Sequence, residues 1–97
     1  MADDAIRLDL FLWFVRIVKT RQCARLLATE GRIRIDGHPV SRSAAPVRTG
    51  SVLTFALGDT VRAVRVEALP RRRGPASEAA LCITDLIPGV DAAPPAT

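Results

Sequence analysis

The hydrophobic positions near the N-terminus follow the period of a helix. Leu8, Leu12 and Val15 fall on one face, and Asp9 is suited to cap the first turn. We therefore predict a first helix that runs to about Val18.

Three aromatic residues, Phe11, Trp13 and Phe14, make this helix apolar on nearly all sides. Core packing or a contact between helices explains Trp13, and stacking on a nucleobase is the alternative. An apolar helix of this kind is also consistent with an adaptor that docks another protein.

A second helix has its own start and stop signals. The hydroxyl of Thr20 can accept a hydrogen bond from a free N–H of the first turn, and Gly31 suits the left-handed conformation that ends a helix. Ala24 and Leu27 share the face that we expect to pack inward.

Residues 32–35 alternate at the two-residue period of a strand. The pattern turns Ile33 and Ile35 inward and Arg32 and Arg34 outward. Asp36-Gly37 then predicts a tight turn. We expect the helix and the strand to present guanidinium groups side by side.

Beyond this turn the pattern predicts a loop, a hairpin and a third helix. Residues 38–50 are predicted as the loop, and 52–57 and 60–68 as strands joined by a turn at Gly58-Asp59. Residues 77–87 form the predicted helix, which Pro88 ends. Its face toward the sheet is expected to hold Ala80, Leu81, Thr84 and Ile87.

The 97 residues, 48% of them hydrophobic and 25% charged, suit one small globular domain. Helices followed by strands indicate an α+β fold, in which two N-terminal helices pack on a short antiparallel sheet and a C-terminal helix is added. We expect a flexible N-terminus at 1–5, the domain at 6–87 and a disordered tail at 88–97.

Positive charge is concentrated in the first half of the chain. Residues 7–48 hold nine basic and three acidic residues, whereas 49–97 hold five of each. Arg21 and Arg25 are four residues apart and therefore share a helical face. A localised excess of cations suggests a polyanionic partner, although arginine-rich proteomes also produce basic proteins without one.

The sequence offers no catalytic or metal-binding pattern. Cys23 and Cys82 are too few and too far apart for a metal site, and we interpret both as buried thiols. His38 lacks a nucleophile and a carboxylate to pair with, so it is either a solvated loop side chain or a donor to a phosphate. We predict neither enzyme activity nor a cofactor.

The longest apolar run, Leu10 to Val15, is far shorter than a membrane-spanning helix, and the N-terminus lacks a secretory pattern. We expect a cytoplasmic monomer that does not contact membranes. The run Arg71-Arg72-Arg73 is either a solvated charge cluster or a secondary contact for the polyanion.

Many of these positions together resemble the RNA-binding domain named after ribosomal protein S4, which contains the αL motif. The resemblance covers about residues 7–54 and depends on many spacings that agree at once. A narrower resemblance, to the ribosome-associated heat shock protein 15 subfamily, extends to about residue 86 through Leu12-Trp13 and 72–81. The positions that carry the S4 resemblance are Arg7-Leu8-Asp9, Leu12, Arg16, Lys19-Thr20-Arg21, Ala24, Leu27, Gly31, Ile33, Ile35-Asp36-Gly37, Val40, Val47 and Gly50.

The resemblance implies a small α+β S4-like fold that binds structured ribosomal RNA. The family role that it implies is on large ribosomal subunits still holding peptidyl-tRNA, in rescue after stalled translation or heat stress. Longer members carry a basic C-terminal extension, whereas 89–97 here contain Asp91 and no cation. The residues expected to face RNA are Arg7, Arg16, Lys19, Thr20, Arg21, Gln22, Arg25, Arg32, Arg34, Gly37, His38 and Arg42, with Arg71, Arg72 and Arg73 as a secondary basic contact.

Three other functions stay open at this point. The first is an RNA-binding module that recruits a partner enzyme to ribosomal or transfer RNA, and the second is the protein-docking adaptor with its aromatic first helix. The third is a DNA binder that uses 21–30 as a recognition helix. That helix has few base-reading side chains beyond Gln22 and leads straight into a strand.

Overall fold

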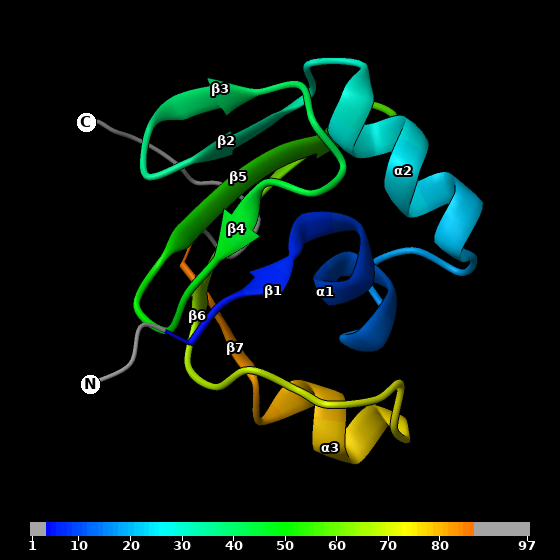
Figure 1. Ribbon diagram of the computed structural model, residues 1–97, viewed down its shortest axis with the longest axis vertical. Helices are drawn as coiled ribbons and strands as arrows, with labels where there is room; N and C mark the ends of the chain where they lie inside the picture. The colour runs from blue at the N-terminus through cyan, green and yellow to red at the C-terminus, as the bar shows by residue number, and fades with distance from the viewer. Residues whose placement is uncertain (1–3, 87–97) are drawn as a thin grey trace.

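The computed structural model of the protein describes residues 4–86. Figure 1 shows a five-stranded antiparallel sheet with α1 and α2 packed against one side. The helices of the described chain are α1 (Leu8–Phe14), α2 (Arg21–Thr29) and α3 (Ala76–Ala80). The strands of the large sheet, in spatial order, are β3 (His38–Val40), β2 (Ile33–Ile35), β5 (Val52–Leu57), β6 (Thr60–Val66) and β7 (Ile83–Asp85), while β1 (Ile6–Arg7) pairs with β4 (Pro46–Val47). The predicted α+β fold is confirmed.

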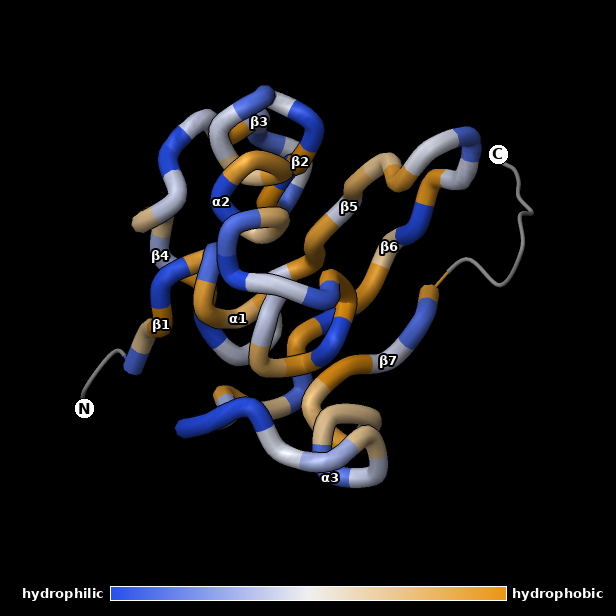
Figure 2. The backbone as a smooth tube through the Cα atoms, turned by 90° about the vertical axis from the view of Figure 1, so that its right-hand side faces the viewer, coloured by the Kyte–Doolittle hydropathy of each residue, from blue (hydrophilic) through white to orange (hydrophobic). Residues whose placement is uncertain are grey.

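The hydrophobic core lies between α1, α2 and one face of the large sheet. Phe11 and Leu12 of α1 are fully buried, as are Ile33 of β2 and its cross-strand partner Phe55 of β5. Figure 2 shows mainly apolar colour along α1, β5 and β6, whereas hydrophilic colour recurs along α2 and the hairpin of β2 and β3. Burial of these side chains, each stabilising by about 1.5–3 kcal/mol, holds the helices on the sheet.

The first helix is shorter than predicted, and Asp9 is not its cap. The N-cap is Arg7, and the first free N–H groups of α1 donate instead to the carbonyl oxygens of Ala45 (2.9 Å from Leu8 N) and Ser43 (3.0 Å from Asp9 N). A loop distant in sequence therefore satisfies the helix terminus, which no local pattern could indicate.

The helix also ends at Phe14 and not near Val18, because Arg16 adopts a left-handed conformation (φ 64°). Arg16 N–H donates to the Trp13 carbonyl oxygen at 3.1 Å, and Ile17 N–H donates to the Leu12 carbonyl oxygen at 3.0 Å. These are the two hydrogen bonds of a Schellman C-cap, in which glycine is the usual left-handed residue. An arginine at that position gives no stop signal in the sequence.

The signals around the second helix are confirmed. Thr20 Oγ1 accepts a hydrogen bond from Cys23 N–H at 3.0 Å, and Gly31 is left-handed (φ 74°) just past the helix. Ala24 and Leu27 are buried. Left-handed Asp36 and Gly37 (φ 52° and 84°) form the predicted turn, which joins β2 to β3.

The segment predicted as a loop, 38–50, contains two short strands. β3 pairs with β2 through Ile35↔His38, Arg34↔Pro39 and Ile33↔Val40, and β4 pairs with β1 through Ile6↔Val47 and Arg7↔Pro46. Prolines in both strands hid them, since proline is tolerated only at sheet edges. Both strands are at such edges.

The C-terminal helix was predicted too long. α3 covers only Ala76–Ala80, and 83–85 form the edge strand β7 instead. Of the residues in α3 only Ala79 is buried, whereas Ala80, Leu81 and Thr84 are exposed, so the predicted inward face is wrong. The pairing of β7 with β6 overrides the weak helical pattern, and Ile87 lies outside the described residues.

Other expectations have mixed outcomes. Cys23 is exposed and Cys82 is half-buried, so the interpretation of both as buried thiols is wrong. Most of the predicted flexible N-terminus and all of the predicted tail at 88–97 lie outside the described residues. Within residues 4–86, no helix is long and apolar enough to cross a membrane.

Candidate nucleic-acid interface

The outer face of α2 carries polar groups that do not contact the core. Arg21, Gln22 and Arg25 are exposed, while the inward face of the same helix is buried on α1 and the sheet. The two arginines are one helical turn apart and point to the same side. Thr20 and Lys19, just before the helix, are exposed as well, although the Thr20 hydroxyl oxygen already caps Cys23.

The hairpin of β2 and β3 lies next to α2 in the chain and presents its turn to solvent. Asp36 Oδ1 accepts a hydrogen bond from Val52 N–H at 2.9 Å, which fixes the turn to β5. No atom lies within 4 Å of where a side chain on Gly37 would begin, so the backbone there is open to close approach. His38 and Arg42 are exposed on either side of β3.

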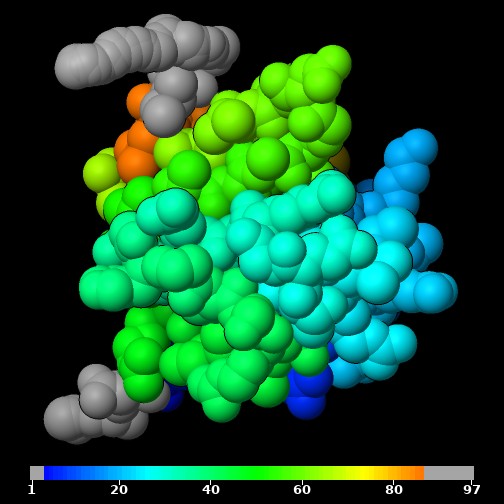
Figure 3. Space-filling model, turned by 90° about the horizontal axis from the view of Figure 1, so that it is seen from above, coloured from blue at the N-terminus to red at the C-terminus, as the bar shows by residue number. Residues whose placement is uncertain are grey.

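These segments form one face of the molecule. Figure 3 shows residues of α2, the β2–β3 hairpin and the following loop as a continuous surface, from light blue through turquoise to green. Arg34 is an exception to the expected arrangement. It alternates with buried Ile33, so its side chain leaves the sheet on the side opposite to α2 and does not lie beside Arg21 and Arg25.

Basic side chains with and without acidic partners are distributed unevenly. Within residues 4–86, ion pairs engage Arg7, Arg32, Arg62, Arg65 and Arg72, and Arg16 and Arg73 donate to backbone carbonyls. No side-chain hydrogen bond or ion pair in this part of the chain involves Lys19, Arg21, Arg25, Arg34, Arg42, Arg48 or Arg71. All but the last of these lie between residues 19 and 48, on and around α2 and the hairpin.

Two of the residues expected to face RNA have structural partners. Arg7 pairs side-on with fully buried Asp9, through Nε to Oδ1 and Nη2 to Oδ2, both at 3.1 Å. The hydrogen bonds and then the charge of Asp9 raise the pKa of Arg7 above its ordinary value. Arg32 pairs with Glu30 at 3.3 Å, but both side chains are about half exposed and solvent can compete.

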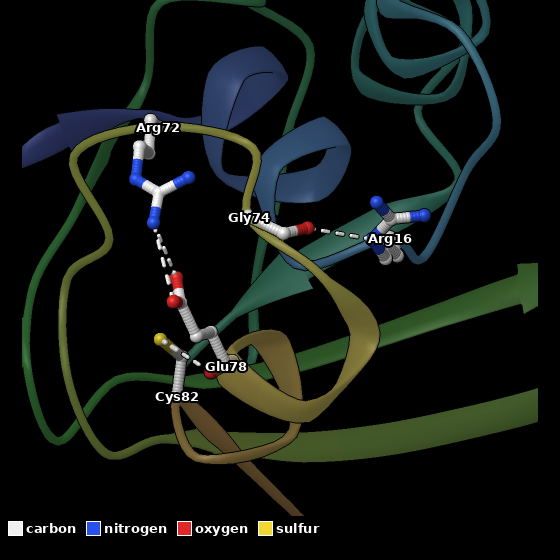
Figure 4. Close-up of polar contacts among 5 residues, drawn as sticks. All are labelled: Arg16, Arg72, Gly74, Glu78 and Cys82. Atoms are coloured by element: carbon white, nitrogen blue, oxygen red, sulfur yellow. Dashed lines mark hydrogen bonds and ion pairs between the residues drawn. The ribbon is translucent and has the colours of Figure 1, made fainter.

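Arg16 likewise holds the fold together. The segment between β6 and α3, residues 67–75, crosses the end of α1, and Arg16 Nε donates to the Gly74 carbonyl oxygen at 2.7 Å. Figure 4 shows this contact on one side of the segment and the contact of Arg72 with Glu78 on the other. Arg16 is therefore bound to the protein itself through one of its N–H groups.

The three consecutive arginines differ in their surroundings. Arg73 Nε donates to the Trp13 carbonyl oxygen at 3.1 Å, and its guanidinium lies 5.7 Å from the centre of the Trp13 ring. Arg72 Nη2 contacts both carboxylate oxygens of Glu78, at 3.0 and 3.2 Å. Only Arg71 is exposed without such a partner in the described chain.

Contacts of the aromatic residues support the core interpretation of Trp13. Phe11 is fully buried, and Trp13 and Phe14 are half-buried with Arg73 over the Trp13 ring. The helix therefore lacks the open aromatic face that a docking adaptor needs. Around the neighbouring segment, partial burial raises the pKa of the Cys82 thiol, and the Glu78 carboxylate raises it further.

One cation that the candidate list omitted belongs to the same region. Arg48 is exposed directly after β4, and its side chain has no acidic partner within residues 4–86. It lies in the basic half of the sequence, which was the available signal. Among the described residues, no group of three His, Cys, Asp or Glu side chains could hold a metal ion.

A small α+β domain with a cationic face left unneutralised by its own acids defines a class, that of binding modules for polyanions. Comparison with known proteins narrows this class. The S4 domain model matches residues 6–53. The chain is 36% identical to heat shock protein 15 of Escherichia coli K12 over 86 residues, which are 89% of this chain and 64% of the relative.

Two further matches agree. The RQC P-site tRNA stabilizing factor of Bacillus subtilis strain 168 is 36% identical over 64 residues, 66% of this chain and 73% of the relative. The trimeric structure of Vibrio cholerae heat shock protein 15 matches with a TM-score of 0.79 and 26% identity, covering 86% of this chain and 83% of that one. The chain thus belongs to the S4 domain family of RNA-binding proteins, where it is similar to heat shock protein 15.

Proposed function

We propose that this protein binds structured ribosomal RNA in the cytoplasm, on large ribosomal subunits that still carry peptidyl-tRNA after stalled translation or heat stress. The name of the E. coli relative supports the link to heat, and the name of the B. subtilis relative supports the link to P-site tRNA. The chain spans 64% of the length of the E. coli relative. We further propose that it acts by binding alone, as a monomer, and catalyses no reaction.

The observation that carries this proposal is the gathering of unpaired cations on and around α2 and the hairpin. Lys19, Arg21 and Arg25 have no acidic neighbour to neutralise them, whereas Arg62 and Arg65 of β6 do. Phosphates that approach the first group displace condensed counterions without breaking an ion pair in the protein.

Shape, and not base sequence, is what this surface is suited to recognise. Guanidinium groups bind phosphate oxygens in pairs of parallel hydrogen bonds, and they carry little information about bases. Gln22 is the only side chain on the exposed face of α2 with both amide donor and acceptor groups. A folded RNA offers fixed arrays of phosphates that a rigid helix and hairpin can match.

The test neutralises the two arginines of α2. In Arg21→Gln/Arg25→Gln, the affinity for purified large-subunit RNA should fall, and the slope of log affinity against log salt should decrease in magnitude by about two because two phosphate contacts are lost. Fluorescence anisotropy at several salt concentrations measures both quantities. Thermal stability should stay close to that of the wild type, since neither side chain has a partner in the described chain.

The control is Arg62→Gln/Arg65→Gln, which removes the same net charge from β6. If binding depends on the α2 face, this variant retains the wild-type salt slope. Equal losses in the two double variants would show that only total charge matters and would refute the assignment of the surface.

A further inference from the structure

A hollow of about 540 Å³ opens beside the β2–β3 hairpin. Ile35 and His38 face each other across the hairpin, and Val40 faces Ile33, so these side chains leave the strands on the side of the core. β3 is the edge strand of the sheet. The chain that continues to Pro46 forms the opposite wall of the hollow.

The chemistry of the walls is mixed in an ordered way. Ile35, Val40 and Pro46 supply apolar surface, while Ser41 and Arg42 bring a hydroxyl and a guanidinium to the lining. Within residues 4–86, the side chains of His38, Ser41 and Arg42 take part in no hydrogen bond or ion pair. Asp36, the acidic residue of the lining, is engaged with Val52 N–H.

The geometry points to a pocket for one unstacked nucleobase of the bound RNA, an inference that rests on the proposed function. The volume lies within the roughly 300–1,000 Å³ range of small-ligand clefts and is sufficient for a base with its ribose. An imidazole ring can stack on a base, and Arg42 can hold the phosphate attached to it. A bare phosphate would gain little from the apolar walls.

Position favours a nucleotide over other occupants. The hollow adjoins the surface formed by α2 and the hairpin in Figure 3, so an RNA held by Arg21 and Arg25 passes its mouth. Arg42 at the lining complements a phosphate and not a cationic peptide. The pocket would let the protein prefer RNA that has an unpaired base next to a helix over a continuous duplex.

The experiment compares three fluorescent RNAs with the full chain: a hairpin with an unpaired loop, the same hairpin with abasic loop nucleotides, and a blunt duplex with the same number of phosphates. Loops of each of the four nucleotides are tried in turn. Anisotropy should show that at least one loop binds more tightly than its abasic form by about five-fold or more, the lower range for a stacked base. The abasic hairpin and the duplex should bind alike.

Two variants identify the wall of the pocket. His38→Ala should bring the ratio between loop and abasic RNA close to one and leave the affinity for the duplex unchanged. His38→Phe keeps a ring for stacking and should retain the ratio.

The failures are distinguishable. If the wild type binds loop and abasic hairpins equally, the pocket is refuted while the proposed function stands, and this comparison needs no variant to fold. An unchanged ratio in His38→Ala also overturns the pocket. If the wild type binds none of the three RNAs at low salt, the proposed function fails together with the pocket.

Discussion

Arg71, Arg72 and Arg73 are adjacent and chemically identical, yet each side chain has different surroundings. Arg73 donates to a carbonyl at the end of α1 and lies over Trp13, Arg72 pairs with Glu78 at the surface, and Arg71 is exposed. Their contributions to stability should therefore differ, although a charge count treats them as one cluster.

Replacing Arg73 by Ala should lower the free energy of unfolding by about 1–2 kcal/mol, because a hydrogen bond from a charged group and a cation–π contact are both lost. Arg72→Ala, the neighbouring control, should cost less than about 1 kcal/mol, as is typical of exposed ion pairs. Urea unfolding of both variants measures the difference. Equal costs would contradict the structural role of Arg73.

Residue roles are also where the sequence alone reached its limit. Thr20 and Gly31 were predicted correctly because a cap and a left-handed stop depend on neighbouring residues only. Arg16 and Arg7 could not be separated from the RNA-facing arginines, since their partners are Gly74, far away in the chain, and a buried carboxylate whose burial depends on the whole fold. The basic half and the turn at Asp36-Gly37 were enough to predict the candidate surface.

At the scale of elements, local hairpins were predictable and distant pairings were not. The turn at Gly58-Asp59 joins β5 to β6 as expected, with Leu57↔Thr60 as the last pair. β1 pairs with β4 across about forty residues of chain and each has two residues, so neither has a period to detect. β7 has the same difficulty, and the segment that leads to it through α3 is held at Gly74.

Gly74 tests how that segment is packed. A Cβ at this position would lie 2.3 Å from Oε1 of Glu78, while the Cβ of Glu78 would be at an ordinary 3.4 Å. Gly74→Ala should therefore destabilise by about 1 kcal/mol, because Glu78 must turn away and lose its contact with Arg72. The measurement is urea unfolding.

The matched control is the same change in a Glu78→Ala background. There the obstructing carboxylate is gone, and the smaller conformational freedom of alanine in the unfolded chain should make Gly74→Ala neutral or stabilising by up to about 1 kcal/mol. A cost that is the same in both backgrounds would mean that Glu78 is not what confines Gly74.

At the scale of the whole molecule, charge is separated into two regions. In the described chain the acids neutralise arginines mainly on β6 and near α3, while the surface of α2 and the hairpin keeps its cations free. A compact domain with one such face can approach a polyanion in a single orientation. This separation, more than the net charge of +4, is what links the fold to RNA.

The central claim is tested most directly by sedimentation of the tagged protein with cell lysate through sucrose gradients, at low and moderate salt, before and after heat stress. We predict that the wild type migrates with the large subunit at low salt and leaves it as salt rises, that heat stress increases the bound fraction, and that Arg21→Gln/Arg25→Gln stays at the top while Arg62→Gln/Arg65→Gln follows the wild type. A wild-type protein that remains at the top of the gradient under every condition would contradict the ribosomal role.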